Sequence, residues 1–257
     1  GLFVEIIAPR LWEDARTLDG GFTSNCPQER QYAIDRAKRC ADLADEVGCK
    51  NYVLWLAREG TYIREAKCAR TAVARIVDAW NAILEHNKNI RILGEAKPNE
   101  PTDSAYLPTV GHMMAVTYKT IDPARSGVLI ESAHSILAGL DPSDDMAFAL
   151  YHGKLWSVHL NDQNGLKYDQ DKTFGSVDLR RAFNQVWTLD KNGFGRNGEC
   201  VGLDVKAMRT TSFEDSLRHL ANSRTMFLRL LDIVRAVDEK EVEALRAEKK
   251  YEQLEML

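Results

Sequence analysis

The sequence has 257 residues, of which 44% are hydrophobic and 28% are charged. This length suits one large α/β domain or two small ones and allows a full hydrophobic core. The formal net charge of −4 gives no electrostatic reason to expect a nucleic acid or an anionic membrane as a partner. The chain also lacks the roughly 18 consecutive apolar residues that would predict a membrane-spanning helix.

The cysteines are scattered along the chain without a Cys-x-x-Cys pair, and their number is odd. This pattern favours reduced, structural thiols over a disulfide framework or a zinc site. The first residues, GLFVEIIAPRLWED, lack the basic segment of a secretory signal. We therefore expect a cytoplasmic protein. The cysteines are Cys26, Cys40, Cys49, Cys68 and Cys200.

Six short apolar runs predict parallel strands that are covered on both faces. They occupy residues 2–8, 52–57, 90–96, 127–133, 154–160 and 199–205. Helical patterns lie between them. The first helix is expected to begin near Pro27 and to end near Gly48, which are favourable start and stop residues. The other helices are expected at residues 64–85, 109–119, 143–152, 176–189 and 213–255.

Alternating strands and helices are typical of a parallel α/β fold, either doubly wound or closed into a barrel. No Gly-rich phosphate loop follows the first strand, which favours the barrel over a Rossmann-type sheet. A complete TIM (β/α)8 barrel has eight βα units, and six can be counted here. We expect a partial barrel over residues 1–240 and a C-terminal helical tail over residues 241–257.

Polar side chains follow four consecutive predicted strands at the point where each strand ends. Because the carboxyl ends of barrel strands form one face, we expect these side chains to lie close together. With an aspartate pair in the KYDQD segment, they offer oxygen and imidazole ligands of the kind that Mg²⁺, Mn²⁺ or Co²⁺ accepts. Taken singly, each residue also has an ordinary explanation as a helix cap, a packed histidine or a solvated turn. The candidates are Glu95, Glu131, His134, His159, Asp169, Asp171 and Asp204.

Six segments, in order, resemble the xylose isomerase (glucose isomerase) family of the actinobacterial type. They are DGGFTSN, YVLWLAREG, EAKPNEP, LPTVGH, ESAHSILAGL and GLKYDQDKTFG, and the KPNEP and KYDQD motifs are the most specific. The resemblance implies a (β/α)8 barrel that converts an aldose to a ketose, such as D-xylose to D-xylulose, by a metal-assisted hydride shift. It also implies two divalent cations, a small-molecule sugar substrate and a homotetramer or dimer.

The resemblance further implies a role for each candidate residue. Lys97 matches the lysine that hydrogen-bonds the substrate oxygen at the reacting carbon, and Trp55 and Trp12 match two aromatic walls. With Asp171, these three are the candidate catalytic residues. Glu131 would bridge the two cations, one of them held by Glu95, Glu131, His159 and Asp204 and the other by Glu131, His134, Asp169 and Asp171.

The chain departs from the family pattern in two important ways. Position 159 carries histidine where the family has aspartate, which we expect to shift metal preference from Mg²⁺ towards Mn²⁺, Co²⁺ or Zn²⁺. Asp162 would replace the lost carboxylate if its loop bends back. The first predicted strand also matches the third strand of the family, so the units that open the sugar ring and the C-terminal bracing arm are missing. We therefore expect a fragment of a longer protein.

Three other hypotheses remain open beside the sugar isomerase. The first is an epimerase, a dehydratase or an isomerase of another sugar on the same barrel, suggested by His159. The second, if the chain is complete, is a metal-binding remnant without catalysis. The third is a metal-dependent nuclease for abasic sites, although the acidic composition and the lack of a basic stripe weigh against nucleic-acid binding.

Overall fold

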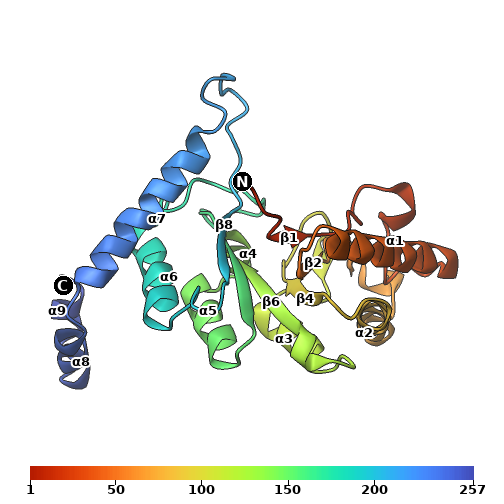
Figure 1. Ribbon diagram of the computed structural model, residues 1–257, viewed down its shortest axis with the longest axis horizontal. Coiled ribbons are helices and arrows are strands. Elements are labelled where there is room, and N and C mark those ends of the chain that lie inside the picture. Colours follow the sequence, from red (N-terminus) through yellow and green to blue (C-terminus); the bar gives the residue numbers. More distant parts are fainter.

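The computed structural model describes residues 1–257 and contains one curved sheet of six parallel strands (Figure 1). The sheet curls into a half-barrel, with β1 and β8 at its two edges, so the predicted partial TIM barrel is confirmed. All six predicted strands are found, most of them shorter than the apolar runs. In sheet order they are β1 (Ile6–Ile7), β2 (Asn51–Trp55), β4 (Arg91–Glu95), β6 (Ser126–Glu131), β7 (Leu155–Leu160) and β8 (Cys200–Leu203).

Helices connect the strands and cover the outer face of the half-barrel (Figure 1). No helix is both long and apolar enough to cross a membrane. A separate pair of two-residue strands, β3 (Gly60–Thr61) and β5 (Ser104–Ala105), is antiparallel. The helices are α1 (Pro27–Glu46), α2 (Ala69–His86), α3 (Val110–Thr117), α4 (Ser132–Leu137), α5 (Pro142–Tyr151), α6 (Leu179–Lys191), α7 (Arg218–Ala236), α8 (Glu239–Ala247) and α9 (Tyr251–Leu254).

Two predicted helices have different boundaries in the structure. The helix expected from residue 64 begins only at Ala69, after a 3-10 turn at Arg64–Ala66. The long helix expected at residues 213–255 is divided into α7, α8 and α9. The first break occurs because Val237 is extended and the Asp238 side chain accepts a hydrogen bond from the Lys240 amide, which caps α8. The proposed division of the chain at residue 240 stays a prediction.

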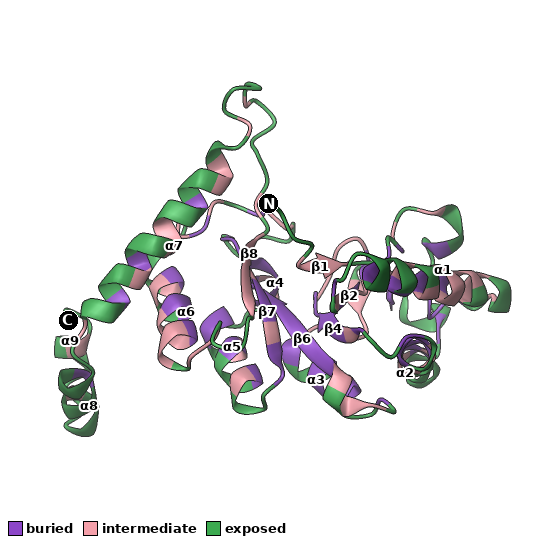
Figure 2. Cartoon of the chain, in the orientation of Figure 1, coloured by how far each residue is buried: buried purple, intermediate pink, exposed green.

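Alternating side chains give the sheet two different faces. Outward-facing residues such as Leu54 and Ile92 join the large core between the sheet and the helices. Inward-facing Val53, Leu93 and Leu129 form a separate small cluster inside the curve. Figure 2 shows that β6, at the centre of the sheet, is buried along its whole length. The inward-facing positions nearest the carboxyl ends of the strands carry the polar site.

A one-residue irregularity in the pairing of β6 with β7 determines which β7 side chain faces the site. Val128 pairs with Leu155, but the next residue, Leu129, pairs with Ser157. Trp156 therefore has no partner in β6 and forms a bulge. As a result Glu131 pairs with His159. Because a one-residue slip reverses the face of every later side chain, His159 would point into the outer core without this bulge.

The DGGFTSN segment forms a buried polar cluster with Glu59 and Lys67. The Glu59 carboxylate accepts hydrogen bonds from the amides of Phe22 (2.8 Å) and Thr23 (2.9 Å) and from the Thr23 hydroxyl (2.6 Å). The buried Lys67 ammonium donates to the carbonyls of Asp19 and Gly60. The DGGFTSN segment therefore has a structural role. Its contacts fix the chain before α1 against the connection between β2 and α2.

The Glu59→Gln variant is expected to lose about 2–4 kcal/mol of unfolding free energy. The glutamine NH2 group would face backbone donors that need an acceptor, and the Glu59 charge near the buried Lys67 ammonium would be lost, which leaves the exposed Asp19 as its acidic partner. Urea denaturation measures the loss. Glu65→Gln, on an exposed turn nearby, is the control and should change stability by less than about 0.5 kcal/mol. Equal stabilities of the two variants would contradict the structural role of Glu59.

Candidate metal centre

Glu131 lies at the centre of the polar site, at the last position of β6, and is 3% exposed. Three groups of possible metal ligands contain it, and within each group the ligand atoms lie within 4.8 Å of one another. The seven ligand candidates from the sequence are all brought together in these groups. The other members are Glu95 with His134, His159 with Asp204, and Asp169 with Asp171.

His134 reaches the site because α4 begins directly after β6. Residues three apart on a helix share a face, so His134 lies beside Glu131, with 3.2 Å between Nε2 and Oε2. The same Nε2 atom lies 3.1 Å from Asp169 Oδ2, and Nδ1 lies 3.4 Å from Glu95 Oε1. The sequence pattern predicted residues 132–133 as the end of the strand, whereas they form the first turn of α4.

The loop after β7 turns both of its aspartates towards Glu131. In an extended chain, the side chains of residues 169 and 171 would point to the same face of the strand. Here the loop is curved, and Asp171 has a φ of 43°, in the left-handed region. The Asp169 amide donates to Glu100 Oε2 (3.0 Å), and the Asp171 carbonyl accepts from the Lys206 amide (2.8 Å). These contacts hold the loop in its curved form.

Negative charge dominates the site. Burial, followed by the neighbouring carboxylates of Glu95 and Asp169, raises the pKa of Glu131 well above its ordinary value. Burial and the adjacent Asp169 raise the pKa of Asp171 to about 6. The pKa of Asp169 is lowered, because His134 and Lys97 outweigh its burial. This accumulation of carboxylates favours a bound cation.

Several buried ligand atoms lack a hydrogen-bond partner in the protein. They are Nδ1 of His134, Nδ1 of His159 and Oδ1 of Asp169. Because buried polar atoms are nearly always satisfied, such atoms at one site fit the coordination of a metal ion. Carboxylates with two imidazoles and no thiolate suit Mg²⁺, Mn²⁺, Co²⁺ or Zn²⁺. The residues present therefore fit a divalent cation.

His159 depends on the neighbouring strand for its position. It pairs with Gly202 of β8, where a Cβ atom would lie 2.7 Å from Cδ2 of the imidazole. Its Nδ1 atom lies 3.7 Å from Oδ2 of Asp204, whose side chain is half exposed. Asp162 does not replace the missing carboxylate, because its Oδ2 atom accepts hydrogen bonds from the amides of Val177 (2.7 Å) and Asp178 (3.1 Å).

Asn161 is a site residue that the sequence analysis missed. Its Nδ2 atom lies 2.8 Å from Glu131 Oε1 and 3.2 Å from Asp171 Oδ1, and it also donates to the Asp204 carbonyl (2.9 Å). Its Oδ1 atom accepts from the Ala133 amide at 2.7 Å. Asn161 thus ties together residues of all three ligand groups. The sequence did contain a signal for it. Residue 161 lies two positions after His159, and alternate residues of a strand point to the same face.

Of the four candidate catalytic residues, Asp171 is itself a possible metal ligand, and Lys97, Trp55 and Trp12 lie close to one another. Lys97 is 8% exposed, and its Nζ atom lies 2.8 Å from Asp169 Oδ2 and 5.3 Å from the centre of the Trp55 ring. Burial alone would lower the pKa of Lys97, but the nearby carboxylates outweigh it and the pKa is raised. Trp12 contacts Trp55 edge to face, with 4.6 Å between ring centres. The three side chains form a continuous aromatic and cationic wall.

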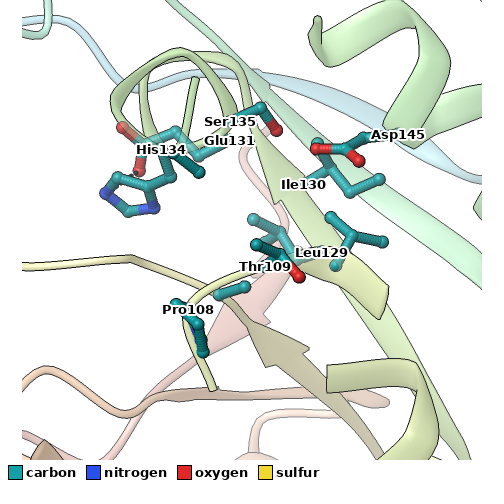
Figure 3. Close-up of a pocket in the computed structure, with 11 residues that line it drawn as sticks. Pro108, Thr109, Leu129, Ile130, Glu131, His134, Ser135 and Asp145 are labelled. Carbon is teal, nitrogen blue, oxygen red and sulfur yellow. Dashed lines mark ion pairs between the residues drawn. The ribbon is translucent and has the colours of Figure 1, made fainter. Parts of the chain in front are cut away.

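A small cavity of about 10 Å³ lies on the side of Glu131 and His134 that faces the core (Figure 3). Pro108, Thr109 and Leu129 line it, and Figure 3 shows the imidazole of His134 pointing away from it. This volume holds at most one water molecule. A ligand larger than water therefore does not fit in this cavity.

Comparisons with known proteins agree with this architecture. The chain is 17% identical to the structure of a D-tagatose 3-epimerase-like protein, with a TM-score of 0.69 over 90% of this chain and 79% of that one. It is 14% identical to 3-keto-D-glucoside 4-epimerase from E. coli, with a TM-score of 0.67 over 87% and 80%. It is 13% identical to an IolI protein with a bound zinc atom, with a TM-score of 0.61 over 92% and 78%. At these identities the likeness shows a shared fold.

A sequence model described as a xylose isomerase-like TIM barrel matches residues 13–222, which is most of the chain. That range contains the five strands β2, β4, β6, β7 and β8 and every candidate ligand. The half-barrel and the sequence match lead to one conclusion, that this chain belongs to the xylose isomerase-like TIM barrel family.

Proposed function

We propose that this chain is a divalent-metal-dependent sugar isomerase, of the type that converts an aldose to a ketose by a hydride shift. The observation that carries the proposal is the shared position of Glu131 in three ligand groups. One carboxylate can bridge two divalent cations, whose combined charge of +4 would offset four of the five negative charges of the acidic side chains. Bound cations would polarise the sugar carbonyl and lower the pKa of the adjacent hydroxyl group.

The protein's own residues would supply the rest of the chemistry. Lys97 would donate a hydrogen bond to the oxygen at the reacting carbon, where negative charge develops. The carboxylate of Asp171 would accept the proton of the substrate hydroxyl. Trp55 and Trp12 would exclude water from one side of the sugar. Asn161 would hold the carboxylates of Glu131 and Asp171 in place, and His134 would be one of the metal ligands.

The second candidate is a sugar epimerase. Epimerisation next to a carbonyl removes a proton and returns it on the opposite side, and a single cation is enough to polarise the carbonyl. The group of Glu131, His159 and Asp204 offers one imidazole and two carboxylates for such a single ion. Two of the similar structures are described as an epimerase or epimerase-like, and this is consistent with the second candidate.

Product analysis in D2O distinguishes the two reactions. The purified chain is incubated with Mn²⁺ or Mg²⁺ and a panel of aldoses and ketoses, including xylose, glucose and tagatose. An isomerase working by hydride shift gives a product without deuterium on carbon, whereas an epimerase working by proton transfer incorporates deuterium from the solvent. Turnover without deuterium supports the isomerase, and incorporation favours the epimerase. Failure to convert any sugar in the panel with either cation would contradict both.

The His159→Asp variant is expected to raise activity with Mg²⁺ relative to activity with Mn²⁺ by about tenfold. Aspartate adds a hard, charged oxygen ligand, which Mg²⁺ prefers to imidazole. Activity is measured across a titration of each cation. His152→Asp is the control, because His152 is exposed at the opposite end of β7 and should leave the ratio unchanged. An unchanged ratio in both variants would show that residue 159 is not a metal ligand.

A further inference from the structure

A second polar cavity, of about 560 Å³, lies beside the candidate metal centre. It is formed by the loop after β7, the loop after β8 and the first turns of α7, three segments that meet at the carboxyl end of the sheet (Figure 1). This volume is far larger than the small cavity behind Glu131 and falls in the usual range for sites of small organic ligands. Its lining is mainly polar.

The cavity is positively charged in a protein whose net charge is −4. Its lining includes Lys172, Lys206, Arg209 and Arg218, against one acidic residue, Asp215. Arg218 pairs with Asp215 at 3.3 Å, and Lys206 pairs with Asp171. Lys172 and Arg209 form no ion pair within the protein, so two positive charges at the cavity are uncompensated.

The start of α7 adds a further positive contribution. This helix has 19 residues, its first turn contains no acidic side chain, and no side chain caps its N-terminus. The first turn lines the cavity through Arg218 and His219. The N-terminal end of a helix carries partial positive charge and free amide groups, which favour an anion. The hydroxyl groups of Thr173 and Ser176, on the facing loop, supply additional hydrogen-bond donors.

The cavity shares a wall with the metal centre. Lys172 directly follows Asp171, and the Lys206 amide donates to the Asp171 carbonyl at 2.8 Å. Lys206 also lies two residues after Asp204. A group held in the cavity would therefore lie beside Lys206, whose ammonium pairs with the Asp171 carboxylate of the metal centre.

We propose that this cavity binds an anionic group, phosphate or carboxylate, and that the group belongs to the sugar substrate. Uncompensated Lys172 and Arg209 would provide most of the attraction, with Lys206 between the anion and the catalytic carboxylates. The assignment of the anion to the sugar rests on the proposed function, whereas binding of an anion in the cavity does not.

Calorimetric titration of the metal-loaded chain with inorganic phosphate tests the anion site. The double variant Lys172→Met/Arg209→Met is expected to bind phosphate at least about tenfold more weakly than the unchanged chain. Arg229→Met is the control, because Arg229 is exposed further along α7 without an ion pair and should change the affinity by less than about twofold. Absence of saturable binding, or equal affinity in the double variant, would overturn the proposal. Equal affinity would mean that phosphate binds at the metal centre instead.

A second titration identifies the source of the anion. Sugar phosphates and aldonates are compared with inorganic phosphate and with neutral sugars. Tighter binding of an anionic sugar than of phosphate, lost in the double variant, supports a substrate group. Equal binding of anionic sugars and free phosphate would retain the anion site and overturn its assignment to the substrate. Turnover of neutral sugars by the double variant, measured in parallel, tests the proposed function independently.

Discussion

Replacing Glu131 with glutamine is expected to lower sugar turnover by on the order of 1,000-fold and to weaken the binding of both cations. Glutamine has nearly the same size but removes the negative charge that all three ligand groups share. Stabilisation by metal ions is worth several kcal/mol in such reactions, and each 1.4 kcal/mol corresponds to a factor of ten in rate. No other residue in the site belongs to every group, so no other single substitution should affect both cations equally.

Thermal unfolding provides a readout that does not depend on activity. A ligand that binds only the folded state raises the unfolding temperature in proportion to the logarithm of its concentration over its Kd. Added Mn²⁺ should therefore raise the unfolding temperature of the unchanged chain and have little effect on Glu131→Gln. Without metal, the variant should be at least as stable as the unchanged chain, because burial and neighbouring carboxylates already disfavour a charged Glu131.

Asp145→Asn is the matched control for this experiment. Asp145 is a partly buried carboxylate that lines the same small cavity as Glu131 but lies outside the three ligand groups (Figure 3). Its substitution should leave the response to Mn²⁺ unchanged. If calorimetry of Glu131→Gln showed the loss of one cation with the other bound normally, Glu131 would be a ligand of one site only and the bridging arrangement would be wrong.

The sequence was sufficient to predict the six parallel strands and the end of the sheet at which the polar residues gather. Continuous apolar runs indicate strands buried on both faces, and in a parallel sheet their carboxyl ends lie at one edge. Glu95 and Glu131 follow directly from this rule, because each is the final residue of its strand. The prediction succeeded where one local pattern determined the position of a side chain.

Other features depend on contacts between segments far apart in the chain and could not be read from local patterns. The bulge at Trp156 is possible because Gly127 leaves room for the ring, and it is this bulge that brings His159 to the inner face. Asp162 is drawn away from the site by amides near the start of α6. The cationic cavity combines residues 170–176, in the loop after β7, with residues 206–222, so no short sequence window contains it.

Replacing Lys97 with methionine is expected to reduce turnover by about 100- to 1,000-fold while leaving the number of bound cations unchanged. Methionine keeps most of the side-chain length and its packing against Trp55, but it removes the positive donor from the place where we expect the reacting oxygen. Because the interaction would form mainly in the transition state, kcat and kcat/KM should fall together. Steady-state kinetics with the sugar identified in the D2O experiment measures both constants.

Metal titration of the same variant separates a catalytic role for Lys97 from a positioning role. The Lys97 ammonium lies 2.8 Å from Asp169, so its loss could also disturb a metal ligand. Unchanged affinity for both cations, together with reduced kcat, supports direct action on the substrate. Weakened metal binding in proportion to the lost activity would mean that Lys97 acts through Asp169. Lys167→Met, an exposed lysine in the same loop as Asp169, is the control and should preserve turnover as well as metal affinity, because its nearest acidic partner, Asp103, is also exposed.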